Sequence, residues 1–195
     1  EILRDAASMA LDAVKLGSPD LFYRIALHQR DPHSAAHLAH LLRENGAEVL
    51  FHETENAFFV PTAQPMARFV NEMLGVQRYP EVKPVPGPDI VPPYDVTAWS
   101  LPLMMGVTVE KVTRGSDARA TLRPVNGTDL PQGSVENPDA SQFIISHERN
   151  AVSRLVNDLV QGEGRVSITA ADVKVGGEPF VKGADLLEKV KDHAE

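Results

Sequence analysis

The chain contains two copies of one pattern, and this repeat constrains the fold more than any other feature. In the first copy, an apolar run over residues 21–27 is followed by His28-Gln29-Arg30-Asp31 and then by a helical stretch. In the second, residues 142–146 are followed by His147-Glu148-Arg149-Asn150 and again by a helical stretch. A repeat of this kind indicates the architecture before local detail does, and two copies are too few for a solenoid.

Both copies then continue alike, with a β-rich run, a second short extended piece and a final helix. These β-rich runs are residues 48–51 and 165–169, and the extended pieces are residues 58–60 and 179–181. A strand, a helix and a strand within about 30 residues predict a right-handed parallel βαβ unit. We therefore expect an α/β fold of the flavodoxin-like kind, with three layers and one mainly parallel sheet. Its two related halves would each be a strand–helix–strand–strand–helix unit.

The pattern also predicts how the chain is divided. Residues 1–17 read as a helix, because their apolar residues recur with a period near 3.6 and Gly17 begins a stop signal. Since the chain opens within this helix, we expect it to connect to an absent upstream domain. Residues 18–195 are expected to form a single domain. It would consist of a first half (20–76), a Pro-rich crossing (77–103) anchored by aromatic residues including Trp99, a hairpin (104–125) and a second half (140–195).

Composition excludes several classes of partner. The 195 residues carry a formal net charge of −8 without a cluster of Lys and Arg, which argues against nucleic acid and anionic membranes as partners. No apolar run approaches the roughly 20 residues that a membrane span needs. Cysteine is absent, so disulfides, thiolate metal sites and cysteine nucleophiles are excluded.

One long segment is distinctive enough to suggest a family. It reads Pro93-Tyr94-Asp95-Val96-Thr97-Ala98-Trp99-Ser100-Leu101-Pro102-Leu103-Met104-Met105-Gly106-Val107. This segment resembles a signature found downstream of the catalytic domain in bacterial members of the M14 family of zinc carboxypeptidases. Gln29-Arg30-Asp31-Pro32 and the stretch from Val60 to Pro65 resemble the same family. The resemblance implies an amidotransferase-like α/β domain, similar to class I amidotransferases in fold.

The resemblance also implies a function without catalysis in this segment. Peptidases of the family bind zinc in the upstream domain, so we expect no cofactor here and a parent that is a zinc-dependent hydrolase. The segment would be a non-catalytic accessory domain that shapes access to the peptidase active site or mediates association. Its partners would be the upstream peptidase domain and possibly a second copy of itself. The family also favours an exported or periplasmic parent. An amidotransferase reaction is excluded, because it needs a cysteine nucleophile.

The two repeated corners offer an alternative function. His28, Arg30 and Asp31, and likewise His147, Arg149 and Asn150, follow a strand and precede a helix. Ligands of open α/β sheets bind at such places, and helix amides favour anions. The corners could therefore bind a carboxylate-bearing peptide or sugar. The simpler interpretation is structural: Asp31 and Asn150 would be N-caps, and the arginines would pair with nearby carboxylates.

Three histidines form a candidate metal site. His33, His37 and His40 are spaced so that they project from one face of the first helix after a strand. Such a set can hold zinc, but a metalloprotease helix would carry Glu next to the first His, and here Ser34 follows. A His-rich helix face with no metal is the other interpretation.

Overall fold

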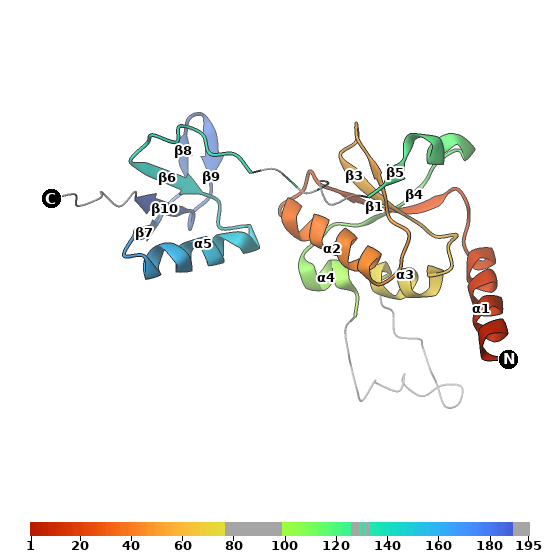
Figure 1. The fold of residues 1–195 in the computed structure, drawn as a ribbon. Coiled ribbons are helices and arrows are strands. Elements are labelled where there is room, and N and C mark those ends of the chain that lie inside the picture. The colour runs from red at the N-terminus through yellow and green to blue at the C-terminus, as the bar shows by residue number, and fades with distance from the viewer. Residues whose placement is uncertain (77–98, 126–128, 130, 132, 189–195) are drawn as a thin grey trace, which may run out of the picture. The chain divides into compact units, whose positions relative to one another are not determined.

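The computed structural model describes residues 1–76, 99–125, 129, 131 and 133–188, which belong to two compact units, Glu1–Leu130 and Pro131–Glu195 (Figure 1). Strands of the two units lie in separate sheets: five strands in the first, and a three-stranded sheet and a two-stranded hairpin in the second. Every strand pair of the described residues is antiparallel. The expectation of a three-layer, mainly parallel, flavodoxin-like sheet is therefore wrong, and the fold is mixed α/β with small antiparallel sheets.

The N-terminal unit has a recognisable strand order. Its elements are α1 (Ile2–Leu16), β1 (Leu21–Ala26), α2 (Pro32–Glu44), β2 (Leu50–His52), β3 (Ala57–Pro61), α3 (Ala67–Leu74), α4 (Leu101–Met105), β4 (Glu110–Thr113), a 3-10 helix (Ser116–Thr121) and β5 (Arg123–Pro124). The sheet order is β4-β1-β3-β2-β5. Without α1, the short α4, the 3-10 helix and the edge strand β5, the chain follows the β-α-β-β-α-β order of ferredoxin-like, split βαβ folds.

The position of β3 explains why β1 and β2 do not pair with each other as the predicted parallel βαβ unit requires. β1 and β2 run parallel, as the sequence predicts, but β3 lies between them and pairs antiparallel with both. All five residues of β3 are buried, so the strand belongs at the centre of the sheet. A four-residue turn, with Asn56 at a φ of 47°, connects β2 directly to β3 and favours an antiparallel hairpin over a crossover.

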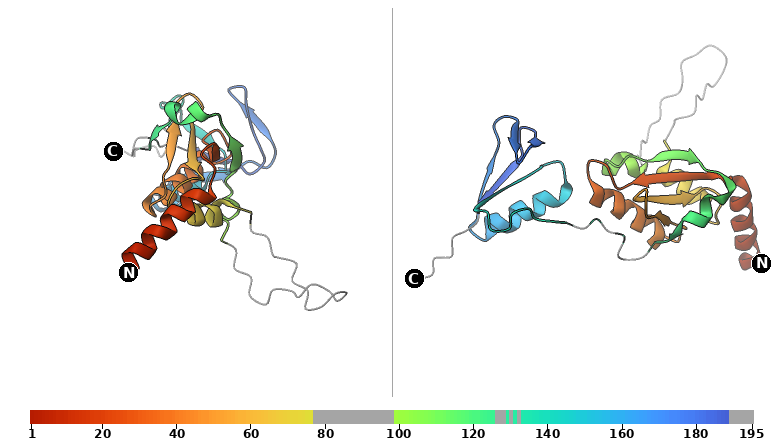
Figure 2. Two further views of the ribbon diagram at one scale, coloured as in Figure 1. Left: turned by 90° about the vertical axis from the view of Figure 1, so that its right-hand side faces the viewer. Right: turned by 90° about the horizontal axis from the view of Figure 1, so that it is seen from above.

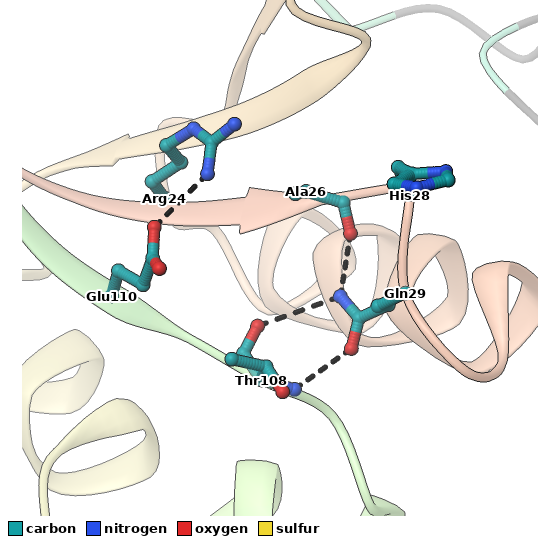
Figure 3. A pocket seen from close by; sticks show the side chains of 6 residues that line it. All are labelled: Arg24, Ala26, His28, Gln29, Thr108 and Glu110. Atoms are coloured by element: carbon teal, nitrogen blue, oxygen red, sulfur yellow. Dashed lines mark hydrogen bonds and ion pairs between the residues drawn. The ribbon is translucent and has the colours of Figure 1, made fainter.

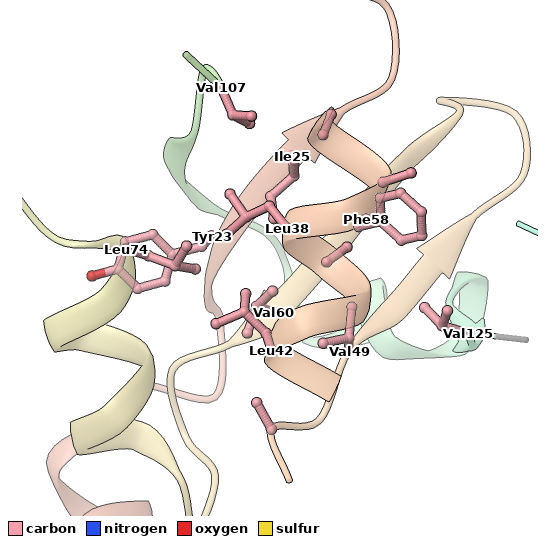
Figure 4. Packing of buried hydrophobic residues seen from close by; sticks show 14 of the residues in the cluster. Tyr23, Ile25, Leu38, Leu42, Val49, Phe58, Val60, Leu74, Val107 and Val125 are labelled. Carbon is pink, nitrogen blue, oxygen red and sulfur yellow. The ribbon is translucent and has the colours of Figure 1, made fainter. Parts of the chain in front are cut away.

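The main core lies between this sheet and its helices. Helices α2, α3 and α4 contribute residues to one cluster on a sheet face, and Phe58 of β3 packs in this cluster beside α2 (Figure 4). Its ring contacts Phe51 at a centroid distance of 5.0 Å and meets His40 edge-on at 6.2 Å. On the opposite face, Phe22 and Phe59 pack edge-to-face. Both faces of the central strands are therefore covered by side chains.

An ion cluster supports the edge formed by β5. The Arg123 guanidinium lies over the Phe51 ring and forms two hydrogen bonds to the buried carboxylate of Asp129. Its Nε donates to Glu53. The hydrogen bonds to Asp129 and then Glu53 raise the pKa of Arg123 above its ordinary value. The pairing of β5 with β2 thus places these charges together.

The segment 104–125 differs from the expected hairpin. Pro102 near the start of α4 and Gly106 at its end, with a φ of 64°, make residues 101–105 a short helix, so the hairpin does not begin at residue 104. β5 pairs with β2, not with β4. Trp99, which the sequence analysis placed in the core, is 41% exposed. Residues 77–98 of the Pro-rich crossing lie outside the described residues.

The C-terminal unit repeats part of the first. It contains β6 (Gln142–Ile145), α5 (Asn150–Gln161), β7 (Arg165–Ile168), β8 (Val173–Val175), β9 (Glu178–Phe180) and β10 (Asp185–Glu188). The sheet order is β6-β10-β7, and β8 and β9 form a hairpin that projects from this unit (Figure 2). The strand that completes the sheet of the second copy is thus β10, not the extended piece 179–181. The final helix predicted after this piece is wrong, because residues 185–188 form β10. Residues 189–195 lie outside the described residues.

The two copies share a topology and a register. In each, the third strand lies between the first two and pairs antiparallel with both. Ala26 faces Ala57 in the first copy, and Ile145 faces Asp185 in the second. His28 lies two residues after Ala26, and His147 lies two residues after Ile145. The matching positions allow the two corners to be compared residue by residue.

Helix α1 has the bounds that its periodicity predicts, Ile2–Leu16. Its C-terminal end is anchored on the N-terminal unit through the buried Ala13 and contacts with α3. Within the part of the chain that the structure describes, no helix combines the length and apolarity needed to span a membrane.

Candidate functional site

The strongest candidate site is a corner where β1 passes into α2. The strand ends at Ala26, the buried Leu27 anchors the chain, and residues 28–30 form an exposed turn before α2 begins at Pro32. The segment leading into β4 lies beside this turn, since β4 pairs with β1. The corner therefore brings together two segments that are far apart in the sequence, since Gln29 and Thr108 are 79 residues apart.

The side chain of Gln29 joins these two segments. Its Oε1 accepts a hydrogen bond from the Thr108 backbone N–H at 2.8 Å, and its Nε2 donates to the Ala26 carbonyl and, at 3.4 Å, to the Thr108 carbonyl (Figure 3). Gln29 is thus fully used in holding the backbone, and it positions the corner rather than offering free groups to a ligand.

An open pocket of about 200 Å³ lies beside Gln29 (Figure 3). Its lining residues come from β1, the β1–α2 turn and the segment around the start of β4, and they are Arg24, Ala26, His28, Gln29, Thr108 and Glu110. All belong to the N-terminal unit. The lining is polar and charged, which favours a small polar group over an apolar ligand.

Charges in the pocket are partly compensated. Arg24 pairs with Glu110 at 2.9 Å and with Glu55 at 3.4 Å, so its guanidinium already has two carboxylate partners. Arg30 lies on the neighbouring turn and does not line the pocket; its side chain is exposed, and no ion pair among the described residues involves it. His28 is exposed as well. The corner therefore offers a guanidinium and an imidazole to an anion.

The segment around α4 forms the other wall of the corner. Gly106 ends α4 in the left-handed region, and the N–H of Val107 donates to the Pro102 carbonyl at 2.8 Å. Val107 is buried in the core, which places Thr108 opposite Gln29. A Cβ built on Gly106 would lie 3.5 Å from a terminal nitrogen of Arg30. Gly106 and Arg30, which belong to two of the three stretches named for the family resemblance, therefore lie side by side here.

Asp31 has the structural role that its sequence position predicts. The buried carboxylate accepts hydrogen bonds from the backbone N–H groups of His33 and Ser34 and from the Ser34 hydroxyl. It is the N-cap of α2, with Pro32 at the first helical position. The N-cap interpretation is confirmed for Asp31, which leaves His28 and Arg30 as the exposed candidate residues of the first corner.

We expect Asp31→Ala to lower the free energy of unfolding by about 1–2 kcal/mol, because two amides and a hydroxyl lose their acceptor. Asp31→Asn retains one acceptor and should lose less. Urea unfolding monitored by circular dichroism measures both. An alanine variant as stable as the wild type would show that the cap contributes nothing.

The second corner is built differently. Helix α5 begins at Asn150, so Asn150 is the first helical residue and Arg149 holds the N-cap position, without a side-chain cap bond. Asn150 is therefore not the predicted N-cap. His147 contacts the buried Asp185 instead, with Nδ1 and Oδ2 2.8 Å apart. The two corners belong to different units, and the pocket is lined by the first alone.

The candidate metal histidines do not converge. His33 and His37 are exposed, whereas His40 packs against Phe58 in the core. Among the described residues, no group of three or more His, Cys, Asp or Glu is placed to hold a metal ion.

Sequence reasoning missed Arg24, Gln29, Thr108 and Glu110 as site residues. A signal existed for Arg24, which is the one charged residue in the apolar run 21–27. Its position opposite Glu110 follows from the pairing of β1 with β4, and no local pattern reports that pairing.

Comparison of the chain with protein-family models, with curated proteins and with solved structures gave no match.

Proposed function

We propose that the chain is a non-catalytic accessory domain of a zinc metallocarboxypeptidase-like protein, and that the β1–α2 corner binds a carboxylate group of a peptide. The observation that carries the proposal is the corner itself: Gln29 bonds to Thr108 beside a polar pocket, and Arg30 lies against Gly106 on the same turn. Gln29 and Arg30 belong to one of the stretches that resemble the M14 family, and Gly106 belongs to another.

The chemistry of the corner favours binding of an anion. Arg30 can offer two parallel N–H donors to a carboxylate, which is the strongest common form of such recognition. His28 lies on the same turn and can add a hydrogen bond. Arg24, already paired with Glu110 and Glu55, holds the pocket wall and does not compete for the ligand.

In the parent protein, the zinc and the general base would belong to the upstream peptidase domain. The accessory domain would then hold a carboxylate-bearing segment of a substrate or partner close to that domain, and so shape substrate access or association. A freestanding module that binds a peptide or a sugar carboxylate is the second candidate, and the same pocket supports it.

Binding is tested with N-acetylglycine as the probe and N-acetylglycinamide as the control without a carboxylate. We expect N-acetylglycine to bind in isothermal titration calorimetry and Arg30→Ala to weaken it about tenfold or more, since a charged hydrogen-bonded pair is lost. Arg43→Ala, which removes another exposed arginine of α2, should leave the affinity unchanged.

Two outcomes would contradict the proposal. Equal binding of the amide would show that the carboxylate is not recognised. A fall in melting temperature for Arg30→Ala, with unchanged affinity, would show that Arg30 is structural. The non-catalytic assignment is tested separately: hydrolysis of C-terminal peptide substrates by this chain, abolished by a chelator, would overturn it.

A further inference from the structure

We propose that His147 is a reactive imidazole, oriented by the buried carboxylate of Asp185, that accepts an acyl group at Nε2 from activated neutral acyl donors. This site lies in the C-terminal unit and is independent of the carboxylate-binding corner.

The geometry fixes which ring nitrogen is available. His147 Nδ1 lies 2.8 Å from Asp185 Oδ2, while the His147 side chain is 63% exposed and the Asp185 side chain 4% exposed. An ionised carboxylate only accepts hydrogen bonds, so Nδ1 must carry the proton. The lone pair of the neutral ring is then on Nε2. Because Nδ1 is occupied by the carboxylate and most of the ring is exposed, Nε2 is the nitrogen left to meet a reagent.

The position of Asp185 is unexpected for a purely structural residue. It begins the central strand of a small sheet, where Ile145 and Ile168 are its cross-strand neighbours. A buried carboxylate is costly, and an apolar residue at such a site often stabilises a protein as well or better. At the matching position the N-terminal unit has Ala57, and no ion pair among the described residues involves the corresponding His28. The carboxylate is therefore specific to the second corner.

A carboxylate on Nδ1 favours nucleophilic attack in two ways. It holds the ring in one tautomer and orientation, and it stabilises the positive charge that develops on the ring when Nε2 forms a bond. With diethyl pyrocarbonate, Nε2 bonds to a carbonyl carbon and the C–O bond to the ethyl carbonate group breaks. The ring then releases its Nδ1 proton, and the leaving group takes up a proton and divides into ethanol and carbon dioxide.

The wild-type chain provides its own reference. His33 and His37 are exposed, and no ion pair among the described residues involves them. We expect diethyl pyrocarbonate at neutral pH to modify His147 on the order of tenfold faster than His33 or His37, as read by mass spectrometry of peptides from a time course. Equal or slower modification of His147 would overturn the proposal, and this result needs no variant to fold.

Variants separate positioning from structure. Asp185→Asn keeps the size of the side chain and removes its charge, and it should bring the rate at His147 down to that at His33 and His37. Glu148→Gln removes the neighbouring exposed carboxylate and should leave the rate unchanged. If Asp185→Asn retains the wild-type circular dichroism and the wild-type ratio of rates, Asp185 has no role in orienting the imidazole and the proposal fails.

Discussion

Replacing Gln64 by leucine is expected to destabilise the N-terminal unit by about 3 kcal/mol or more, because three buried or part-buried backbone groups would lose the hydrogen bonds of its amide. Gln64 is 1% exposed. Its Oε1 accepts from the Glu48 N–H at 2.7 Å, and its Nε2 donates to the carbonyls of Pro61 at 2.6 Å and Glu48 at 3.3 Å. Leucine fills the same space and satisfies none of these groups.

Urea unfolding of the full chain measures this effect. Gln161→Leu is the matched control, since Gln161 is exposed at the end of α5 and its replacement should change stability by no more than about 0.5 kcal/mol. If the loss for Gln64→Leu is as small as that of the control, the amide does not hold the start of β2 to the end of β3.

A second large effect is expected for Phe58→Ala, at about 3–5 kcal/mol. Phe58 is fully buried at the centre of the sheet and packs on Phe51 and His40, so its loss opens a cavity between β3 and α2. Thermal unfolding followed by near-ultraviolet circular dichroism would show the change.

Phe180→Ala is the matched control for this prediction. Phe180 lies in β9 of the C-terminal unit and is only partly buried. Its replacement by alanine should therefore lower the free energy of unfolding clearly less than Phe58→Ala. Equal losses for the two variants would contradict a core centred on Phe58, and with it the placement of β3 between β1 and β2.

Local features of the fold could be predicted from sequence because local chemistry determines them. Asp31 followed by Pro32 indicates the start of α2, and the period of apolar residues places α1 close to its observed bounds. The repeat correctly identified two strand–helix–strand segments. These features depend on residues within one or two turns of each other.

Strand pairing could not be predicted in the same way. A strand buried on both faces reads alike in a parallel and in an antiparallel sheet, so the run 57–61 gives no sign that it separates β1 from β2. Short apolar runs are also ambiguous between helix and strand, so the predicted hairpin began at residue 104, inside α4, and residues 185–188 were predicted as a helix. Tertiary contacts decide each case.

In the candidate site, too, residues in a local pattern could be predicted and residues brought in by strand pairing could not. His28, Arg30 and Asp31 were identified from their place between a strand and a helix, and the structure assigns Asp31 to the cap. Thr108 and Glu110 could not be assigned, because they reach the corner only through the pairing of β4 with β1. The segment around Gly106 was noted for its family resemblance, and its place beside Arg30 at the corner emerges only in three dimensions.

The most direct test of the account is a nuclear magnetic resonance titration of the ¹⁵N-labelled chain with N-acetylglycine. If the corner binds a carboxylate, saturable shifts will be confined to the backbone of residues 28–30 and 106–108 and to the Gln29 side-chain amide, and N-acetylglycinamide will cause none. Shifts that fail to saturate, or that occur elsewhere while these residues stay unchanged, would contradict it.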